Sequence, residues 1–181
     1  MTEAPSPAPA PAAPVAAAGE FVYADVPNRA IAYIIDAIII AITLVVVGLV
    51  LAVVGVVAGS FVGATAMLVI GLVVSAVYFI YTWTRMRATF GMQALGMQIG
   101  NAVDGATLTQ DQAIRRWLAI SVPSIAAQAL QPLGLIGNVV ALMAFAWFIF
   151  LVYTTAQSPT KQGWHDTFVN SMVVKAAKKV A

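Results

Sequence analysis

"VPNRAIAYIIDAIIIAI", residues 26–42, is an apolar segment that is interrupted by one carboxylate, Asp36. The chain as a whole is 61% hydrophobic and 9% charged, with a mean hydropathy of +0.92. These values lie far outside the range of soluble domains. The sequence therefore indicates an integral membrane protein in which Asp36 faces protein rather than lipid.

The apolar region around Asp36 is too long for one membrane crossing. From Ile31 to Thr84 no other side chain is charged at pH 7, whereas a crossing needs only about 20 residues. We predict two spans, at about 30–57 and 62–84. Between them Gly55, Gly59 and Gly63 recur every four residues, which is typical either of a turn or of a helix face that packs closely against another helix.

Residues 85–112 are polar and rich in glycine, and we expect them to form a cytoplasmic loop at the membrane surface. "MQALGMQ" within this loop is compatible with a short interfacial helix. Asp104-Gly105, placed between 97–103 and 106–108, is the signal of a two-residue β-hairpin, and "SMVVK", residues 171–175, is a candidate strand beside it.

A further apolar region is interrupted by "QPLGLIG", residues 131–137, and we interpret it as two spans, about 113–131 and 135–156. The positive-inside rule supports an even number of crossings, because the basic residues fall in segments that would then share the cytoplasmic side. The third span is weak, since Leu118–Leu130 covers only about 20 Å; it is tilted, partly re-entrant or dependent on its neighbours. The basic residues are Arg29, Arg85, Arg87, Arg115, Arg116, Lys161, Lys175, Lys178 and Lys179.

The predicted fold class is thus an all-α membrane protein, a small bundle of four transmembrane helices with a small cytoplasmic interfacial segment. Residues 1–20 are rich in Pro and Ala, which predicts a disordered cytoplasmic tail or, alternatively, a docking arm. Residues 176–181 form a basic tail suited to an anionic leaflet. The membrane domain itself is expected over residues 21–175.

Asp36 lies seven residues after Arg29, so on a helix the two share a face, with Asp36 about 10 Å deeper. An intramembrane carboxylate costs on the order of 2.5 to 3.5 kcal/mol, so we expect it to be protonated, paired with Arg29 or Arg115, or hydrogen-bonded to Thr, Ser or Asn. Two roles remain open at this point: proton or ion coupling, and a structural lock near the cytoplasmic end of the helix.

Several classes of function find no support in the residues. The chain has no cysteine and a single histidine, His165, so we expect neither a metal site nor another cofactor. No nucleophile–base pair or phosphate loop is visible, so we do not expect an enzyme. The net charge of +2 does not favour a nucleic-acid partner.

Several segments resemble, in order, those of the RDD family of bacterial membrane proteins, named for one arginine and two aspartates. They are "PNRAIAYIIDAIII", "TFGMQALGMQI", "VDGATLTQDQAIRRW" and "KQGWHDTFVNSMVVK", and the resemblance covers about residues 22–175. It identifies the arginine as Arg29 and the aspartates as Asp36 and Asp166. The family is often described with three helices, and it commonly has basic residues where this chain has Met92, Gln93, Met97 and Gln98.

The resemblance also suggests that Arg29, Asp36 and Asp166 form one charge cluster, in which an Arg29–Asp166 bond seals the cytoplasmic mouth of the bundle. His165, Arg115 and Arg116 are the candidate supporting residues. The implied activity is a small transporter or ion-coupled transport component that uses Asp36; the alternative is an accessory or scaffolding subunit. We expect a multi-pass protein of the bacterial cytoplasmic membrane with both termini cytoplasmic, in contact with the bilayer and assembled as a homo-oligomer or within a larger membrane complex.

Overall fold

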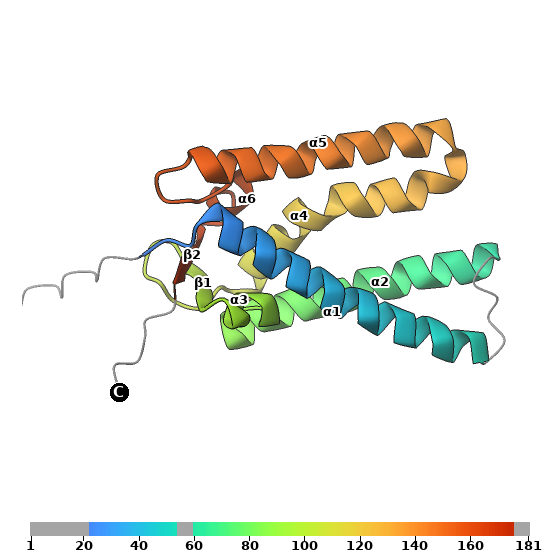
Figure 1. The fold of residues 1–181 in the computed structure, drawn as a ribbon, viewed down its shortest axis with the longest axis horizontal. Coiled ribbons are helices and arrows are strands. Elements are labelled where there is room, and N and C mark those ends of the chain that lie inside the picture. Colours follow the sequence, from blue (N-terminus) through green and yellow to red (C-terminus); the bar gives the residue numbers. More distant parts are fainter. Residues whose placement is uncertain (1–21, 54–59, 176–181) are drawn as a thin grey trace, which may run out of the picture.

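The computed structural model describes residues 22–53 and 60–175, and its long helices run lengthwise with a small sheet at one end (Figure 1). The predictions for the tails 1–20 and 176–181, and for Gly55 and Gly59, lie outside the described residues. The elements are α1 (Val26–Val53), α2 (Phe61–Tyr81), the π-helix η1 (Thr82–Met86), α3 (Phe90–Ala94), β1 (Met97–Asn101), α4 (Gln110–Leu130), the 3₁₀ turn η2 (Gln131–Leu133), α5 (Leu135–Gln157), α6 (Trp164–Thr167) and β2 (Ser171–Lys175).

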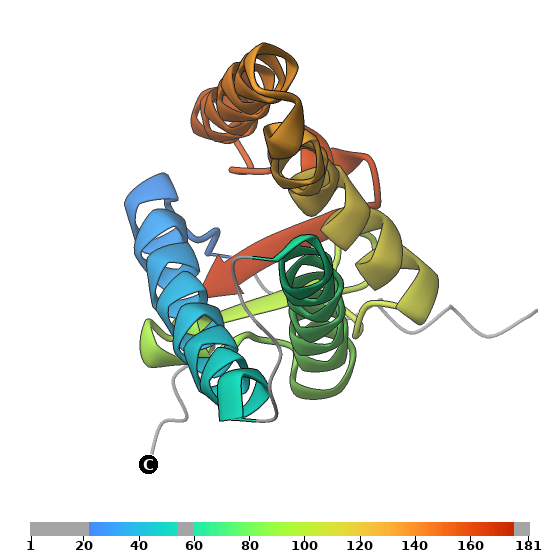
Figure 2. The same ribbon diagram turned by 90° about the vertical axis from the view of Figure 1, so that its right-hand side faces the viewer.

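Helices α4 and α5 form a hairpin whose turn follows the predicted Pro/Gly signal. Gly134 has a φ of +59°, which a glycine adopts readily. A Cβ atom on Gly137 would lie 2.4 Å from the carbonyl oxygen of Leu130, so α5 starts against the end of α4. Viewed along the helices, α4 and α5 lie together, while α1 stands apart from α5 (Figure 2).

Within residues 22–53 and 60–175, three helical segments are long and apolar enough to cross a membrane: Val26–Val53, Phe61–Met86 and Leu135–Gln157. Helix α4 is not one of these candidate spans. Its first half contains Asp111, Arg115 and Arg116, and Pro123 interrupts its hydrogen-bond ladder. The expected count of four transmembrane helices is therefore not confirmed, although α4 converges on α5 toward the turn that joins them (Figure 1).

The small sheet pairs β1 with β2 in antiparallel register, with Ile99 opposite Val173. Strands are thus present in the predicted segments 97–103 and 171–175, and they lie side by side as expected, but the predicted β-hairpin at Asp104-Gly105 is wrong. The turn does form, since the Gly105 N–H donates to the Asn101 carbonyl at 2.9 Å. No second strand follows it, because Thr109 already caps α4 in a capping box with Gln112.

The buried core lies at the sheet end, by which we mean α3, β1, α6, β2 and the helix ends packed on them. Along the rest of α1, α2 and α5 the large apolar side chains face outward, as expected of helices in contact with lipid. The core residues are Ala24, Ala32, Phe79, Trp83, Ala88, Met92, Met97, Ile99, Leu108, Ala113, Trp117 and Val173.

The position of this core makes a testable prediction. Ile99 is fully buried in β1, so Ile99→Ala should lower the free energy of unfolding in detergent by roughly 2 to 5 kcal/mol. Val103, two residues after the same strand, is 85% exposed, and Val103→Ala should change the free energy of unfolding by less than about 0.5 kcal/mol. Equal losses in the two variants would contradict a core at the sheet end.

Candidate functional site

Asp36 is buried in α1, with 2% of its surface exposed, and it accepts three hydrogen bonds. The Tyr78 hydroxyl donates to Oδ1 at 2.6 Å, the Thr89 hydroxyl donates to Oδ2 at 2.6 Å, and the Gly91 N–H donates to Oδ1 at 2.8 Å. These donors come from α2, from the residue that caps α3, and from the first turn of α3. One carboxylate therefore joins three elements.

The local sequence around Thr89 explains this geometry. Thr89 is the N-cap of α3, and its hydroxyl both accepts from the Met92 N–H at 3.1 Å and donates to Asp36. Gly91 permits a very close approach to α1, because a Cβ atom there would lie 2.1 Å from the Ala32 carbonyl oxygen. The "TFG" stretch, residues 89–91, is thus built to bring hydroxyl and N–H donors against Asp36.

Asp166, in α6, is fully buried and receives two arginines. Arg29 Nη1 from α1 donates to Oδ2 at 2.7 Å, and Arg116 Nη1 from α4 donates to Oδ1. The Gly163 N–H also donates to Oδ2, at 3.1 Å, and the Ser171 hydroxyl of β2 donates to Oδ1 at 3.3 Å. The carboxylate therefore connects the starts of two long helices to the sheet.

Charge balance keeps Asp166 ionised. Burial alone would raise its pKa, but the positive charges of Arg116 and Arg29 outweigh burial and hold the pKa well below its usual range. Arg116 is further held by the ring of Trp83, whose centroid lies 5.1 Å from the guanidinium carbon.

His165 is neutral at pH 7, because its pKa is lowered to about 4: burial is the largest cause, and the charges of Arg116 and Arg29 add to it against the attraction of Asp166. The 3.6 Å approach of Nε2 to Asp166 Oδ2 is therefore not an ion pair at neutral pH. Its Nδ1 atom is buried without a hydrogen-bond partner within the part of the chain that the structure describes.

The structure places the sequence-predicted residues in two clusters rather than one. Arg29 and Asp166 are bonded, with Arg116 and His165 beside them, whereas Asp36 takes its own donors from α2 and α3. Its contact with Thr89 matches one of the expected partner types. Gly63 lies at the first turn of α2, where its N–H donates to Ser60 Oγ at 3.0 Å, so its described role is in the helix cap.

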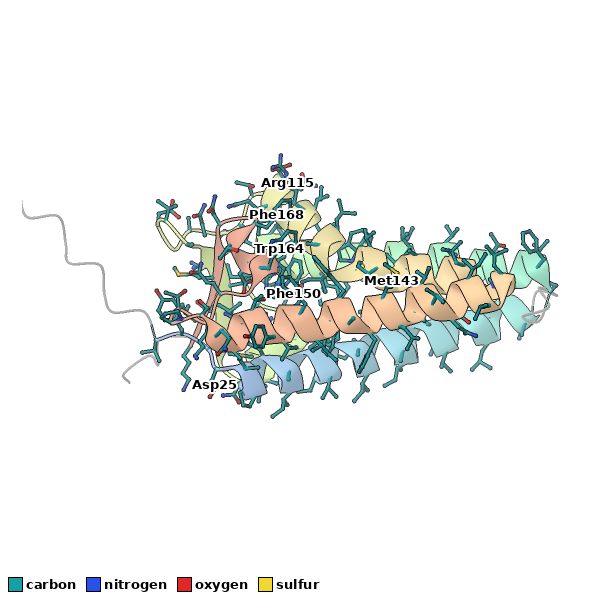
Figure 3. All side chains as sticks on the ribbon, turned by 90° about the horizontal axis from the view of Figure 1, so that it is seen from above. Asp25, Arg115, Met143, Phe150, Trp164 and Phe168 are labelled. Carbon is teal, nitrogen blue, oxygen red and sulfur yellow. The ribbon has the colours of Figure 1, made fainter. Side chains whose placement is uncertain are left out.

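Arg115 belongs to neither cluster. It projects outward from α4 (Figure 3), and its Nε atom pairs with Asp111 at 3.0 Å, with both side chains more than half exposed. The expected pairing of Arg115 with Asp36 is therefore not made. Sequence reasoning also missed Tyr78, Gly91 and Ser171, of which only Gly91 carried a signal, as a glycine two residues after a cap-forming threonine.

The cavity beside these clusters has a volume of about 380 Å³. Its wall includes Arg29, Asp36, Arg116 and His165, together with apolar side chains of α1, α4 and α5. The two clusters therefore border the same space, which is also lined by side chains of α1, α4 and α5.

A bundle of membrane-length apolar helices, fastened at one end by buried carboxylates, defines a small integral membrane protein. Comparison with known families gives the class a name: the sequence model of the RDD family matches residues 23–170, and the chain belongs to the RDD family. The matched range contains Arg29, Asp36 and Asp166. No curated protein and no solved structure matches the chain.

The Asp36 contacts predict a large structural effect. Asp36→Ala leaves three donors without an acceptor, so the free energy of unfolding in detergent should fall by roughly 3 to 5 kcal/mol. The matched control is Asp111→Ala, which breaks only an exposed ion pair and should cost less than about 1 kcal/mol. Similar melting temperatures for the two variants would rule out the interpretation of Asp36 as an anchor.

His165 predicts a pH dependence. Its pKa is 6.5 in the unfolded chain and about 4 when folded, so the unfolded state binds more protons between these values. Stability should therefore fall as the pH decreases from about 6.5 to about 4, by up to roughly 3 kcal/mol. In His165→Gln this part of the decline should disappear, as measured by thermal unfolding across the pH range. A variant with the wild-type slope would show that His165 is not responsible.

Proposed function

We propose that this RDD-family protein is a non-enzymatic accessory subunit of a membrane-protein complex, and that its two buried carboxylates hold its cytoplasmic end together. The observation that carries the proposal is the bonding of Asp36. A proton carrier must exchange its proton with water, but Asp36 is 2% exposed and both of its oxygens accept bonds from neighbouring elements. Such an environment favours an anchor.

The surface of the helices supports an assembly partner. Outward-facing residues of α1, α2 and α5 are almost all apolar, and many of them are half exposed or more. Lipid or the helices of other subunits can cover such apolar faces, whereas a pathway for ions needs polar side chains along it. The partner is then a second copy of the chain or a larger membrane complex.

The distribution of positive charges favours a cytoplasmic location for the sheet end, in a protein of the bacterial inner membrane. Arg29 and Arg116 bond to Asp166 at this end, and Arg87 donates to the Gly105 carbonyl after β1. Positive residues favour the cytoplasmic side, so both termini are placed there in this proposal.

A second candidate function is ion-coupled transport, and one observation favours it. The cavity of about 380 Å³ reaches Asp36 as well as Arg29 and Arg116, so an ion that entered it would meet ionisable groups. Opening of the Tyr78 and Thr89 contacts would then expose the carboxylate.

Flux measurements separate the two functions. Wild type, Asp36→Asn and the control Asp111→Asn are reconstituted at equal density, and proton and sodium flux are recorded. The accessory role predicts no flux above protein-free vesicles in any of the three, together with a lower melting temperature for Asp36→Asn alone. Flux in wild type and Asp111→Asn that is lost in a folded Asp36→Asn would overturn the accessory role in favour of transport.

A further inference from the structure

The cavity between α1 and α5 is built from two kinds of wall. Its outer part is apolar and aromatic, with Tyr33 and Ile34 from α1 and Phe148 and Val152 from α5. Tyr33 and Phe148 face each other across it, with ring centroids 6.2 Å apart. The two helices lie close together at the sheet end and diverge toward the other end (Figure 1). Both are long and apolar enough to cross a membrane, so this part of the lining belongs to the segments that lipid chains surround.

The inner part of the cavity is cationic. Arg29 and Arg116 line it, and they share Asp166 as their carboxylate partner. Within the Asp166 cluster, two guanidinium groups against one carboxylate leave one positive charge over, since His165 is neutral at pH 7. Asp36 also borders the cavity, but its oxygens already accept bonds from Tyr78, Thr89 and Gly91.

Unpartnered donors at this inner end favour an anionic ligand. The side chain of Arg116 is 6% exposed, yet its Nε atom has no hydrogen-bond partner among the described residues. The Nε atom of Arg29 is in the same situation, and it lies within one turn of the start of α1. Buried donors of this kind are ordinarily satisfied, and a guanidinium group is well suited to a phosphate.

We propose that this cavity binds an anionic phospholipid, with its phosphate at Arg116 and Arg29 and an acyl chain between α1 and α5. The cationic end lies at the ends of the spanning helices, which is the depth of lipid headgroups. A free anion would satisfy the arginines but leave the apolar wall uncovered, whereas an amphipathic lipid fits both parts. A volume of about 380 Å³ lies within the range of roughly 300 to 1,000 Å³ that is usual for ligand pockets.

Tryptophan quenching by brominated lipid tests this site directly. Trp83 and Trp117 line the cavity, and Trp147→Phe with Trp164→Phe leaves them as the only tryptophans. This background protein is reconstituted in phosphatidylcholine that contains brominated phosphatidylglycerol or, in parallel, brominated phosphatidylcholine at the same mole fraction. We expect quenching to show an apparent preference of roughly tenfold for phosphatidylglycerol, as one charge-assisted hydrogen bond would give.

Matched variants show whether the preference belongs to the cavity. Arg116→Gln should abolish it, while Arg115→Gln, at the neighbouring exposed arginine, should keep it. Because Arg116→Gln also removes a partner of Asp166, a second variant leaves the charges intact: Ser121→Phe fills the cavity and should abolish the preference. Its control is Val122→Phe, whose position is exposed on α4 and outside the cavity lining.

Three results would overturn the proposal. They are equal quenching by the two brominated lipids in the background protein, a preference retained in folded Ser121→Phe, and a preference removed by millimolar inorganic phosphate, which would indicate a site for free anions. The proposal is independent of the accessory role, because the flux measurements and the quenching measurements can each fail alone.

Discussion

Asp166 receives the guanidinium groups of both Arg29 and Arg116, and the sheet end depends on this shared carboxylate. Arg29 stands at the start of α1 and Arg116 in the first half of α4, while Asp166 itself precedes β2. A buried carboxylate without partners would be strongly destabilising, so the three segments are stable only when they are brought together. The ion pairs therefore fix how α1 and α2 pack against the α4–α5 hairpin.

Asp36 makes a second buried polar connection, which joins α1 to α2 and α3. Its three donors tie α1 to α2 and α3, and Gly91 allows α3 to reach the backbone of α1 at Ala32. Lipid-exposed helix faces gain little from packing, because lipid is as apolar as the side chains. Polar contacts at the sheet end thus supply the specificity that apolar packing along the spans does not provide.

The sequence predicts the apolar helices well, because length and hydropathy determine them directly. The resemblance to the RDD family also groups Arg29 with Asp166, which the structure pairs. It places β2 beside β1, although these segments are about 70 residues apart, but it wrongly adds a hairpin strand after β1, because the local Asp104-Gly105 signal favours one. It assigns Asp36 to the wrong cluster, because helical periodicity gives the face of a helix but not the neighbour that covers it. Hydropathy does not identify the first half of α4 as buried, because Arg116 lies in it. The burial of Arg116 comes from its tertiary contacts with Asp166 and Trp83.

The most direct test of the shared carboxylate is a double-mutant cycle between Arg29→Gln and Asp166→Asn, measured by unfolding in detergent. The exposed pair Arg115→Gln and Asp111→Asn serves as the reference. Our account predicts a coupling energy above about 1 kcal/mol for the buried pair and about 0.5 kcal/mol or less for the exposed pair. Coupling no larger for Arg29 with Asp166 than for Arg115 with Asp111 would contradict it.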